Sequence, residues 1–172
     1  LVSLSIIAQG CLPEGIVFTT QTQIDSFQTD NPGCTEIEGD VIISGNDITN
    51  LNGLNVLTSI GGDLFIYDNV TLTDFTGLES LTSIGGSVNI SANWALTSLT
   101  GLDNLTFIGG GLLIGNSLQG GNSVLSSLNG LESLSSIGGD LGIYYNYDLN
   151  SLIGLDNIDA ASISNLLIIN NS

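Results

Sequence analysis

The sequence contains no lysine, arginine, histidine or methionine. Its 172 residues include 17 aspartates and glutamates, which give a formal net charge of −17. A chain without a cation cannot neutralise phosphates, which argues against nucleic acid as a partner, and an anionic membrane surface would repel it. Without histidine the usual Ser-His-Asp and Cys-His catalytic arrangements are excluded, and an ordinary zinc site is not expected.

Long hydrophobic runs are also missing. The apolar fraction is 42% and the mean hydropathy is +0.40, yet no run approaches the ~20 apolar residues that a transmembrane helix needs. Leucine and isoleucine instead recur regularly among Ser, Asn, Thr and Gly, which is the pattern of a core. We therefore expect one domain with no membrane span within these residues.

Cysteine occurs only twice, at positions 11 and 34. Residues 1–10, LVSLSIIAQG, resemble the end of a secretory signal peptide, with Ala8 and Gly10 at cleavage spacing; a buried N-terminal strand is the alternative. In an exported protein Cys11 and Cys34 are expected to form a disulfide worth about 3 kcal/mol. Lipid attachment at Cys11 is the alternative, although Ala8 stands where lipoproteins usually have leucine. The sequence thus predicts a secreted or cell-surface protein.

One stretch is repeated along the chain. SIGGDLFIYDN (59–69) returns as SIGGSVNISAN (83–93) and SIGGDLGIYYN (136–146). Before each asparagine, two apolar residues alternate with others, which predicts a short strand with one buried face. After the asparagine, apolar residues recur every three positions, which indicates short 3₁₀ or extended turns around a core.

The spacing of the repeat predicts the fold class. Glycine pairs lie at 61/62, 85/86 and 109/110, each 24 residues apart, and a fourth follows 29 residues later at 138/139. One strand per unit at this period indicates a β-rich solenoid of the leucine-rich-repeat type. Stacked parallel coils would pair their strands into a sheet and merge the Leu and Ile columns into one core.

The recurring asparagine is expected to be structural. Placed just after the strand, its side chain can bond free backbone groups of the adjacent coil and form a ladder. The column comprises Asn46, Asn69, Asn93, Asn122, Asn146 and Asn171.

The chain is expected to divide into three parts. Residues 1–10 are the end of the signal peptide. Residues 11–37 form an N-terminal cap with a short helix, in which Thr20 and Gln23 make a capping box, stapled by the disulfide. Residues 38–172 form the repeat solenoid, which we expect to be truncated at its C-terminus because LLIINNS ends as a new strand is completed.

With these features the sequence resembles a receptor L-domain-like leucine-rich repeat protein, and in particular secreted or surface repeat proteins of Bacteroidetes. The resemblance rests on CLPEGIVFTTQTQIDSFQTDNPGCTEIEGDVIISG followed by units such as LNGLNVLTSIGGDLFIYDN and LTGLDNLTFIGG. It covers residues 11–172 and implies a cell-surface or secreted protein. The apolar residue usually falls three positions after the asparagine, which favours the receptor L variety over plain leucine-rich repeats.

Carboxylates are the remaining candidates for chemistry. A glycosidase pair needs its two carboxyls ~5–9.5 Å apart, and the candidates are Asp63 with Asp68, or Asp140 with Asp148. Because Asp63 and Asp140 belong to the repeated GGD turn, solvated turn acids are the favoured interpretation.

Two further columns of side chains are candidates for binding. Asp40, Asp63 and Asp140 could line one edge and bind calcium, but Ser87 and Gly111 interrupt that column and no calcium-loop motif is present. Threonines 58, 82 and 106 could form an ice-binding rank, but their neighbours do not form a second one. No metal and no cofactor are expected.

Aromatic side chains and one insertion are the candidates for recognition. Phe65, Tyr67 and Tyr144 alternate with buried positions and should point outward, while Trp94, Tyr145 and Tyr147 lie at or near strand ends. The stretch GNSLQGG (115–121) adds five residues to one coil, and insertions in repeat arrays often mark a functional edge. The candidate ligand-binding residues are Phe65, Tyr67, Trp94, Tyr144, Gly115 and Gln119. Packing against neighbouring coils or a partner domain is the alternative.

The favoured function is a non-enzymatic secreted or cell-surface recognition or adhesion module, which presents a rigid parallel sheet to a protein or carbohydrate ligand. Exposed aromatic rings on such a sheet are typical of these contacts. A structural spacer within a larger surface protein is the first alternative, and a carboxylate-pair glycosidase is the second.

Overall fold

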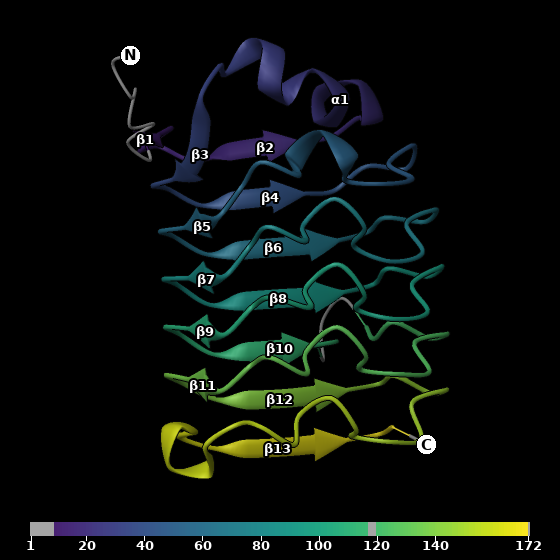
Figure 1. Cartoon of the computed structure of the whole chain (residues 1–172). Coiled ribbons are helices and arrows are strands. Elements are labelled where there is room, and N and C mark those ends of the chain that lie inside the picture. The colour runs from purple at the N-terminus through teal and green to yellow at the C-terminus, as the bar shows by residue number, and fades with distance from the viewer. Residues whose placement is uncertain (1–8, 117–119, 172) are drawn as a thin grey trace.

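A computed structural model describes residues 9–116 and 120–171 of the chain. Residues 1–8 of the predicted signal peptide (1–10) and Gln119 lie outside this part. The strands belong to two sheets, and every pairing between named strands is parallel. Successive coils stack one below the next, and each contributes a rung to the array (Figure 1). The predicted parallel solenoid is thus confirmed.

The larger sheet has seven strands in the order β13-β12-β10-β8-β6-β4-β2. Its strands are β2 (Ile16–Phe18), β4 (Val41–Ile43), β6 (Leu64–Tyr67), β8 (Val88–Ser91), β10 (Leu112–Ile114), β12 (Leu141–Tyr144) and β13 (Leu166–Ile169). Within β6, Leu64 and Ile66 are fully buried while Phe65 and Tyr67 are partly exposed. This alternation gives the sheet one face on the core and one outer face.

The second sheet has six short strands in the order β1-β3-β5-β7-β9-β11. They are β1 (Gln9–Cys11), β3 (Cys34–Ile37), β5 (Ser59–Ile60), β7 (Ser83–Ile84), β9 (Phe107–Ile108) and β11 (Ser136–Ile137). The repeated SI pair therefore forms a strand of its own just before the glycine pair, where the chain turns into the larger sheet. The sequence pattern did not predict this second sheet.

The wall opposite the larger sheet is built of consecutive tight turns. The amide of Leu78 donates to the carbonyl of Phe75 at 3.0 Å, and that of Leu81 donates to Leu78 at 2.9 Å. Each hydrogen bond joins residues three apart in the chain, so every third side chain points to the inside. Phe75, Leu78 and Leu81 are buried there. This is the physical cause of the three-residue period. One such turn is the 3₁₀-helix η1 (Asn52–Leu54), and η2 (Ala160–Ser162) lies before β13.

One glycine in each of these turns allows the coils to approach closely. Gly101 has φ +108°, and a Cβ there would collide with the carbonyl oxygen of Phe75 in the preceding coil. Its amide donates to the Asp103 carboxylate at 2.7 Å. The same glycine-to-acid bond recurs in three other coils, at Gly77–Glu79, Gly130–Glu132 and Gly154–Asp156.

The asparagines that follow the strands of the larger sheet are joined from coil to coil. The backbone amide of Asn69 donates to Oδ1 of Asn93 at 3.2 Å, and Nδ2 of Asn93 donates to the carbonyl of Ile66 at 2.8 Å. The same bonds continue downward through Asn122, Asn146 and Asn171.

The asparagine ladder takes a different partner at its upper end. Asn46 is exposed, and the amide that donates to Oδ1 of Asn69, at 2.9 Å, belongs to Gly45. Gly45 therefore occupies the ladder position that the repeat predicts for Asn46. The side chain of Asn46 turns outward and is not part of the ladder.

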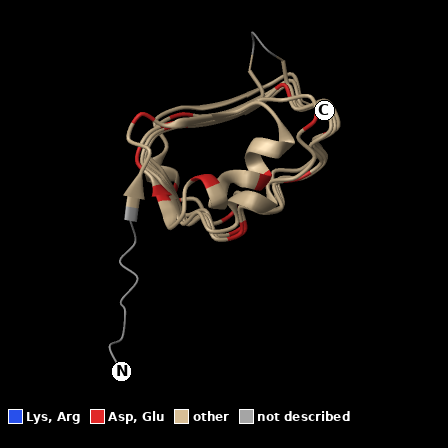
Figure 2. Cartoon of the chain, turned by 90° about the horizontal axis from the view of Figure 1, so that it is seen from above, with Lys and Arg blue, Asp and Glu red and all other residues tan. Residues whose placement is uncertain are grey.

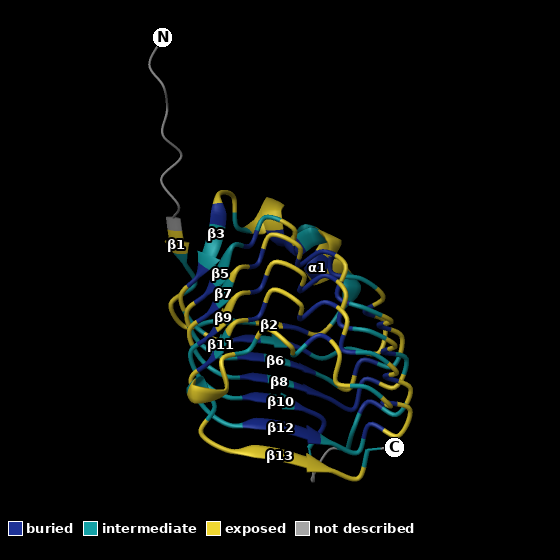
Figure 3. Ribbon diagram, turned by 60° about the horizontal axis from the view of Figure 1, so that its bottom comes forward, coloured by how far each residue is buried: buried dark blue, intermediate teal, exposed yellow. Residues whose placement is uncertain are grey.

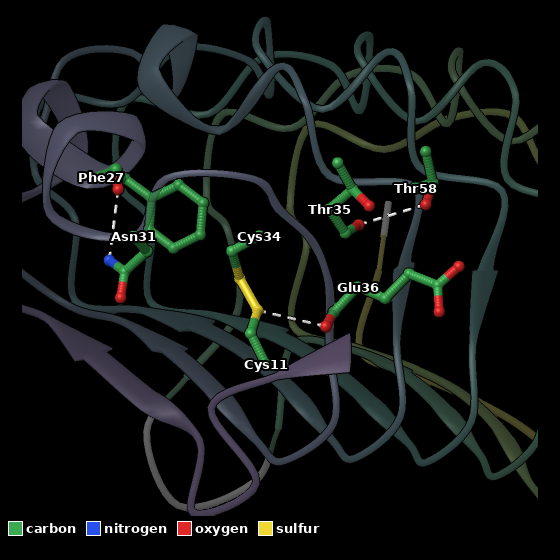
Figure 4. Close-up of a disulfide and its surroundings, with 7 residues drawn as sticks. All are labelled: Cys11, Phe27, Asn31, Cys34, Thr35, Glu36 and Thr58. Carbon is green, nitrogen blue, oxygen red and sulfur yellow. Dashed lines mark hydrogen bonds between the residues drawn. A yellow bond between two sulfur atoms is a disulfide. The ribbon is translucent and has the colours of Figure 1, made fainter. Parts of the chain in front are cut away.

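The N-terminal end is covered by a helix and a disulfide. Helix α1 (Gln21–Asp30) begins at Thr20, whose side chain accepts from the Gln23 amide while the Gln23 side chain accepts from the Thr20 amide, and it buries Ile24 and Phe27 against the first coil. Cys11 and Cys34 are bonded, with their Cα atoms 5.7 Å apart, and join β1 to β3 beneath the end of the helix (Figure 4). The predicted disulfide is confirmed.

Candidate functional site

The outer face of the larger sheet carries a central row set by strand register. Phe65 of β6 pairs with Asn89 of β8, Asn89 with Leu113 of β10, and Leu113 with Gly142 of β12. The row continues to Ile42 and Val17 at one end and to Leu167 at the other. No described strand of this sheet contains an acid. The acids lie instead at the ends of these strands, along the turns, on helix α1 and in β3 of the smaller sheet (Figure 2). The middle of the outer face is therefore mostly apolar and uncharged.

The ring of Tyr144 packs against this face. A Cβ placed on Gly142 would meet the Tyr144 ring at Cε2 and Cζ and would lie 2.8 Å from Cδ2 of Leu113. The absence of a side chain at Gly142 thus leaves room for the ring to cover the sheet, which is how aromatic residues commonly compensate for a glycine in a strand. Tyr144 and Tyr67 occupy the same outward position at the ends of β12 and β6, and both are partly exposed.

Three other aromatic residues gather at the edge where the strands end. Trp94 is 58% exposed and Tyr147 is 59% exposed, and both follow an asparagine of the ladder. The Tyr145 and Tyr147 rings pack edge to face with centroids 6.5 Å apart. Tyr145 has φ +58°, a conformation that is strained for a bulky residue. These rings border the outer face and are not part of it.

The inserted loop begins on buried backbone. Gly115 is buried with φ +78°, and a Cβ there would collide with the carbonyl oxygen of Tyr144. Asn116 and Gly120 then exchange two backbone hydrogen bonds, of 3.1 and 3.0 Å. The structure therefore gives Gly115 a role in coil packing, and a role in ligand contact stays a prediction.

Asn89 stands out in the central row because its side chain is incompletely bonded. Its Oδ1 is shielded from solvent and has no hydrogen-bond partner among the described residues. An unpaired buried acceptor of this kind costs on the order of 1–3 kcal/mol. The sequence pattern gave no signal for this residue beyond its outward position in the strand.

A second irregularity lies at the start of the strands, in the column that follows the glycine pairs. There each side chain accepts from the backbone amide of the next coil: Asp40 from Asp63 at 2.8 Å, Asp63 from Ser87 at 2.6 Å, and Ser87 from Gly111 at 3.1 Å. Position 111 has no side chain to continue the series. Because of that gap, a hollow of about 370 Å³ lies there, lined by Ser87, Gly111, Leu113, Gly139 and Asp140. We call it the Gly111 notch.

The carboxylates proposed as catalytic pairs do not come together. Asp63 precedes β6 and Asp68 follows it, so an extended strand separates their Cα atoms by roughly 16 Å at ~3.3 Å per residue. Asp140 and Asp148 likewise lie beyond opposite ends of β12. Within residues 9–116 and 120–171, no three acidic or cysteine side chains gather as a metal site would require.

The threonine column has its hydroxyls engaged between coils. Thr58 donates to the carbonyl of Thr35 at 3.1 Å, Thr82 to that of Thr58 at 3.0 Å, and Thr106 to that of Thr82 at 3.0 Å. These threonines therefore bind neighbouring coils, and the arrangement explains their recurrence without a ligand.

The last described coil, which contains β13, exposes its inward side chains. Leu166 and Ile168 continue the inward columns of Leu141 and Ile143, but they are 59% and 45% exposed, as the yellow β13 in Figure 3 shows. With Leu152, Leu155 and Ile163 among others they line an apolar hollow of about 280 Å³. Nothing in the described chain covers this surface.

Comparison with known proteins gives one match. The family model for the receptor L domain matches residues 33–100, from the start of β3 to the turn after β8. Neither the curated proteins nor the solved structures give a match. The chain is therefore similar to receptor L domains over that segment, and the narrower likeness to Bacteroidetes proteins stays a prediction. Among the helices that the structure describes, none has the length and apolar character to cross a bilayer.

Proposed function

We propose that this chain is an extracellular recognition or adhesion module that binds a protein ligand on the outer face of its larger sheet. The observation that carries the proposal is the composition of that face. It presents Phe65, Tyr67, Leu113 and Tyr144 on regular strands, with the charged residues kept to its borders. Rigid aromatic area surrounded by polar groups is the usual make-up of a protein-binding hot spot.

Two further observations support a protein ligand outside the cell. The receptor L domain match lies on β3 to β8, which include β6, the strand that carries Phe65 and Tyr67, and receptor L domains are extracellular binding domains. The Cys11–Cys34 disulfide fits an oxidising compartment. The buried columns and the asparagine ladder are occupied by packing between coils and cannot receive a partner, whereas the outer face is accessible to one.

The test uses an array of extracellular protein ectodomains and glycans probed with the described chain. For any ligand found, the double variant Tyr67→Ala/Tyr144→Ala should bind at least about tenfold more weakly, with its melting temperature within a few degrees of wild type. Phe107→Ala is the matched control, because Phe107 is a 43% exposed aromatic residue of β9, in the other sheet.

The outcomes separate the alternatives. Equal binding by the double variant and wild type would refute the outer face as the recognition surface. A structural spacer predicts that the array yields no ligand at all. Ligands confined to glycans would keep the recognition function and replace the protein partner with a carbohydrate one.

A further inference from the structure

The Gly111 notch and the row beside it have a chemistry that selects among protein partners. The notch opens on the same side of the sheet as Leu113, which is two residues further along the chain and lines it. Asn89, with its unpaired Oδ1, is the register partner of Leu113. The notch thus adjoins the central row of the outer face, where the proposed function places the ligand.

The polar groups around the notch are rich in acceptors. One carboxylate oxygen of Asp140 accepts from Nδ2 of Asn165 at 2.7 Å, which leaves further lone pairs on that carboxylate. Ser87 Oγ already accepts from the Gly111 amide at 3.1 Å. Lysine and arginine side chains carry only donors, three and five respectively, and therefore complement this set.

The charge of the chain explains why the notch should favour a basic partner. A partner that seals the outer face removes water from the Asp140 carboxylate, and a desolvated carboxylate is costly unless it is paired. The chain contains no lysine, arginine or histidine that could pair with it. The compensating cation must therefore come from the partner.

The position of the notch within the repeat supports a functional origin. Position 111 interrupts a series of side-chain-to-amide bonds that the preceding coils make with aspartate or serine. The same coil carries the inserted loop, so that the asparagine spacing of 24 residues becomes 29 between Asn93 and Asn122. Two departures from the repeat thus fall in one coil, and departures from a repeat often mark its binding side.

We propose that the Gly111 notch receives a lysine or arginine side chain of the protein ligand, which pairs with Asp140 while neighbouring apolar residues of the ligand pack on Leu113, Phe65 and Tyr144. The inference rests on the proposed function and adds the partner's chemistry to it: a basic segment flanked by apolar residues.

The experiment selects random 12-residue peptides displayed on phage against the immobilised chain, then measures each selected peptide by fluorescence anisotropy at physiological and at ~1 M salt. Selected sequences should contain lysine or arginine next to apolar residues, and replacing that arginine by citrulline should weaken binding about tenfold or more. Peptides without a cation, or no selected peptide at all, would overturn the proposal.

Two variants test the notch itself. Asp140→Asn keeps an oxygen for Asn165 and removes the charge, and Gly111→Ser fills the hollow with the residue found one coil earlier at Ser87. Each should lower affinity about tenfold. Asp25→Asn, on helix α1, removes the same charge elsewhere and should change affinity less than about twofold. A Cβ at position 111 would lie 2.9 Å from the Asp140 carbonyl oxygen, so a folding defect in Gly111→Ser leaves Asp140→Asn to decide.

The failure of this inference is distinct from failure of the proposed function. Equal losses in Asp140→Asn and Asp25→Asn would mean that the peptides respond to overall charge alone, which overturns the notch. Loss of binding in Tyr67→Ala/Tyr144→Ala with full binding in both notch variants would also overturn the notch while the outer face keeps its role. Full binding in the aromatic double variant would instead refute the proposed function.

Discussion

The backbone amide of Asn69 donates to the side-chain oxygen of Asn93, one coil below, at 3.2 Å. Both residues are completely buried. The Asn69 amide cannot reach water there, so the Asn93 side chain supplies its hydrogen-bond acceptor. It is one link of a ladder that runs down the edge of the larger sheet and sets the stacking of one coil on the next.

Replacing Asn93 by alanine should lower the free energy of unfolding by roughly 2–4 kcal/mol, because it leaves the Asn69 amide without its acceptor in the interior and removes a hydrogen bond to the Ile66 carbonyl. Urea denaturation measures the change. Asn46→Ala is the matched control and should cost less than about 0.5 kcal/mol, since Asn46 is exposed. Similar losses at both positions would contradict the ladder as described.

The inward column of the larger sheet should behave as a tightly packed core. Ile90→Ala should cost about 2–5 kcal/mol, because Ile90 is fully buried between Ile66 and Ile114 and leaves a cavity. Leu166→Ala, in the parallel inward column but 59% exposed, should cost less than about 1 kcal/mol. Chemical denaturation of the two variants checks the pair, and a cost below about 1 kcal/mol for Ile90→Ala would mean that the strand register is wrong.

The close approach of coils at Gly101 should make it intolerant of any side chain. Gly101→Ala combines a strained positive φ with a collision against Phe75, so we expect a loss of roughly 2–5 kcal/mol. Gly33 has φ +81° with no atom near its added Cβ, and Gly33→Ala should lose about 1 kcal/mol from strain alone. Equal melting temperatures in the two variants would show that the approach of the coils is looser than described.

The disulfide should stabilise the cap by constraining the unfolded chain. Cys11 and Cys34 close a loop with a sequence separation of 23, so the double variant Cys11→Ser/Cys34→Ser should lose about 3 kcal/mol. Mass spectrometry of non-reduced exported protein should show both thiols protected from alkylation. If both thiols of the folded, exported protein were freely alkylated, the Cys11–Cys34 disulfide would be disproved.

The periodicity of apolar residues in the sequence predicted most of the fold. The alternation around Leu64 and Ile66 predicted the strands of the larger sheet, and the three-residue period predicted the turns that bury Phe75 and Leu78, because both patterns record which side chains face one core. The smaller sheet escaped prediction because a two-residue strand such as Ser59–Ile60 is too short to show an alternation.

The site was less predictable than the fold. The outward position of Phe65 follows from strand period. The Tyr144 ring covers Gly142, only two residues away, but it does so beside Leu113 of the adjacent strand. The unpaired oxygen of Asn89 depends on neighbours in adjacent coils. The departure at Asn46 likewise depends on how the chain around β4 meets the coils on either side. Such features depend on contacts between coils, and a single repeat does not record them.

The exposure of β13 has a consequence for how the 172-residue chain loses structure. A coil in the middle of the stack is held on two sides, whereas the β13 coil is held by the described chain only through β12. In such linear arrays stability is a sum of nearest-neighbour terms. In a protein made of these 172 residues alone, backbone amides should therefore exchange with deuterium fastest in β13 and progressively more slowly toward the disulfide-bonded helix. That protein would unfold from the β13 end, and the disulfide-bonded end would be the last part to lose its structure.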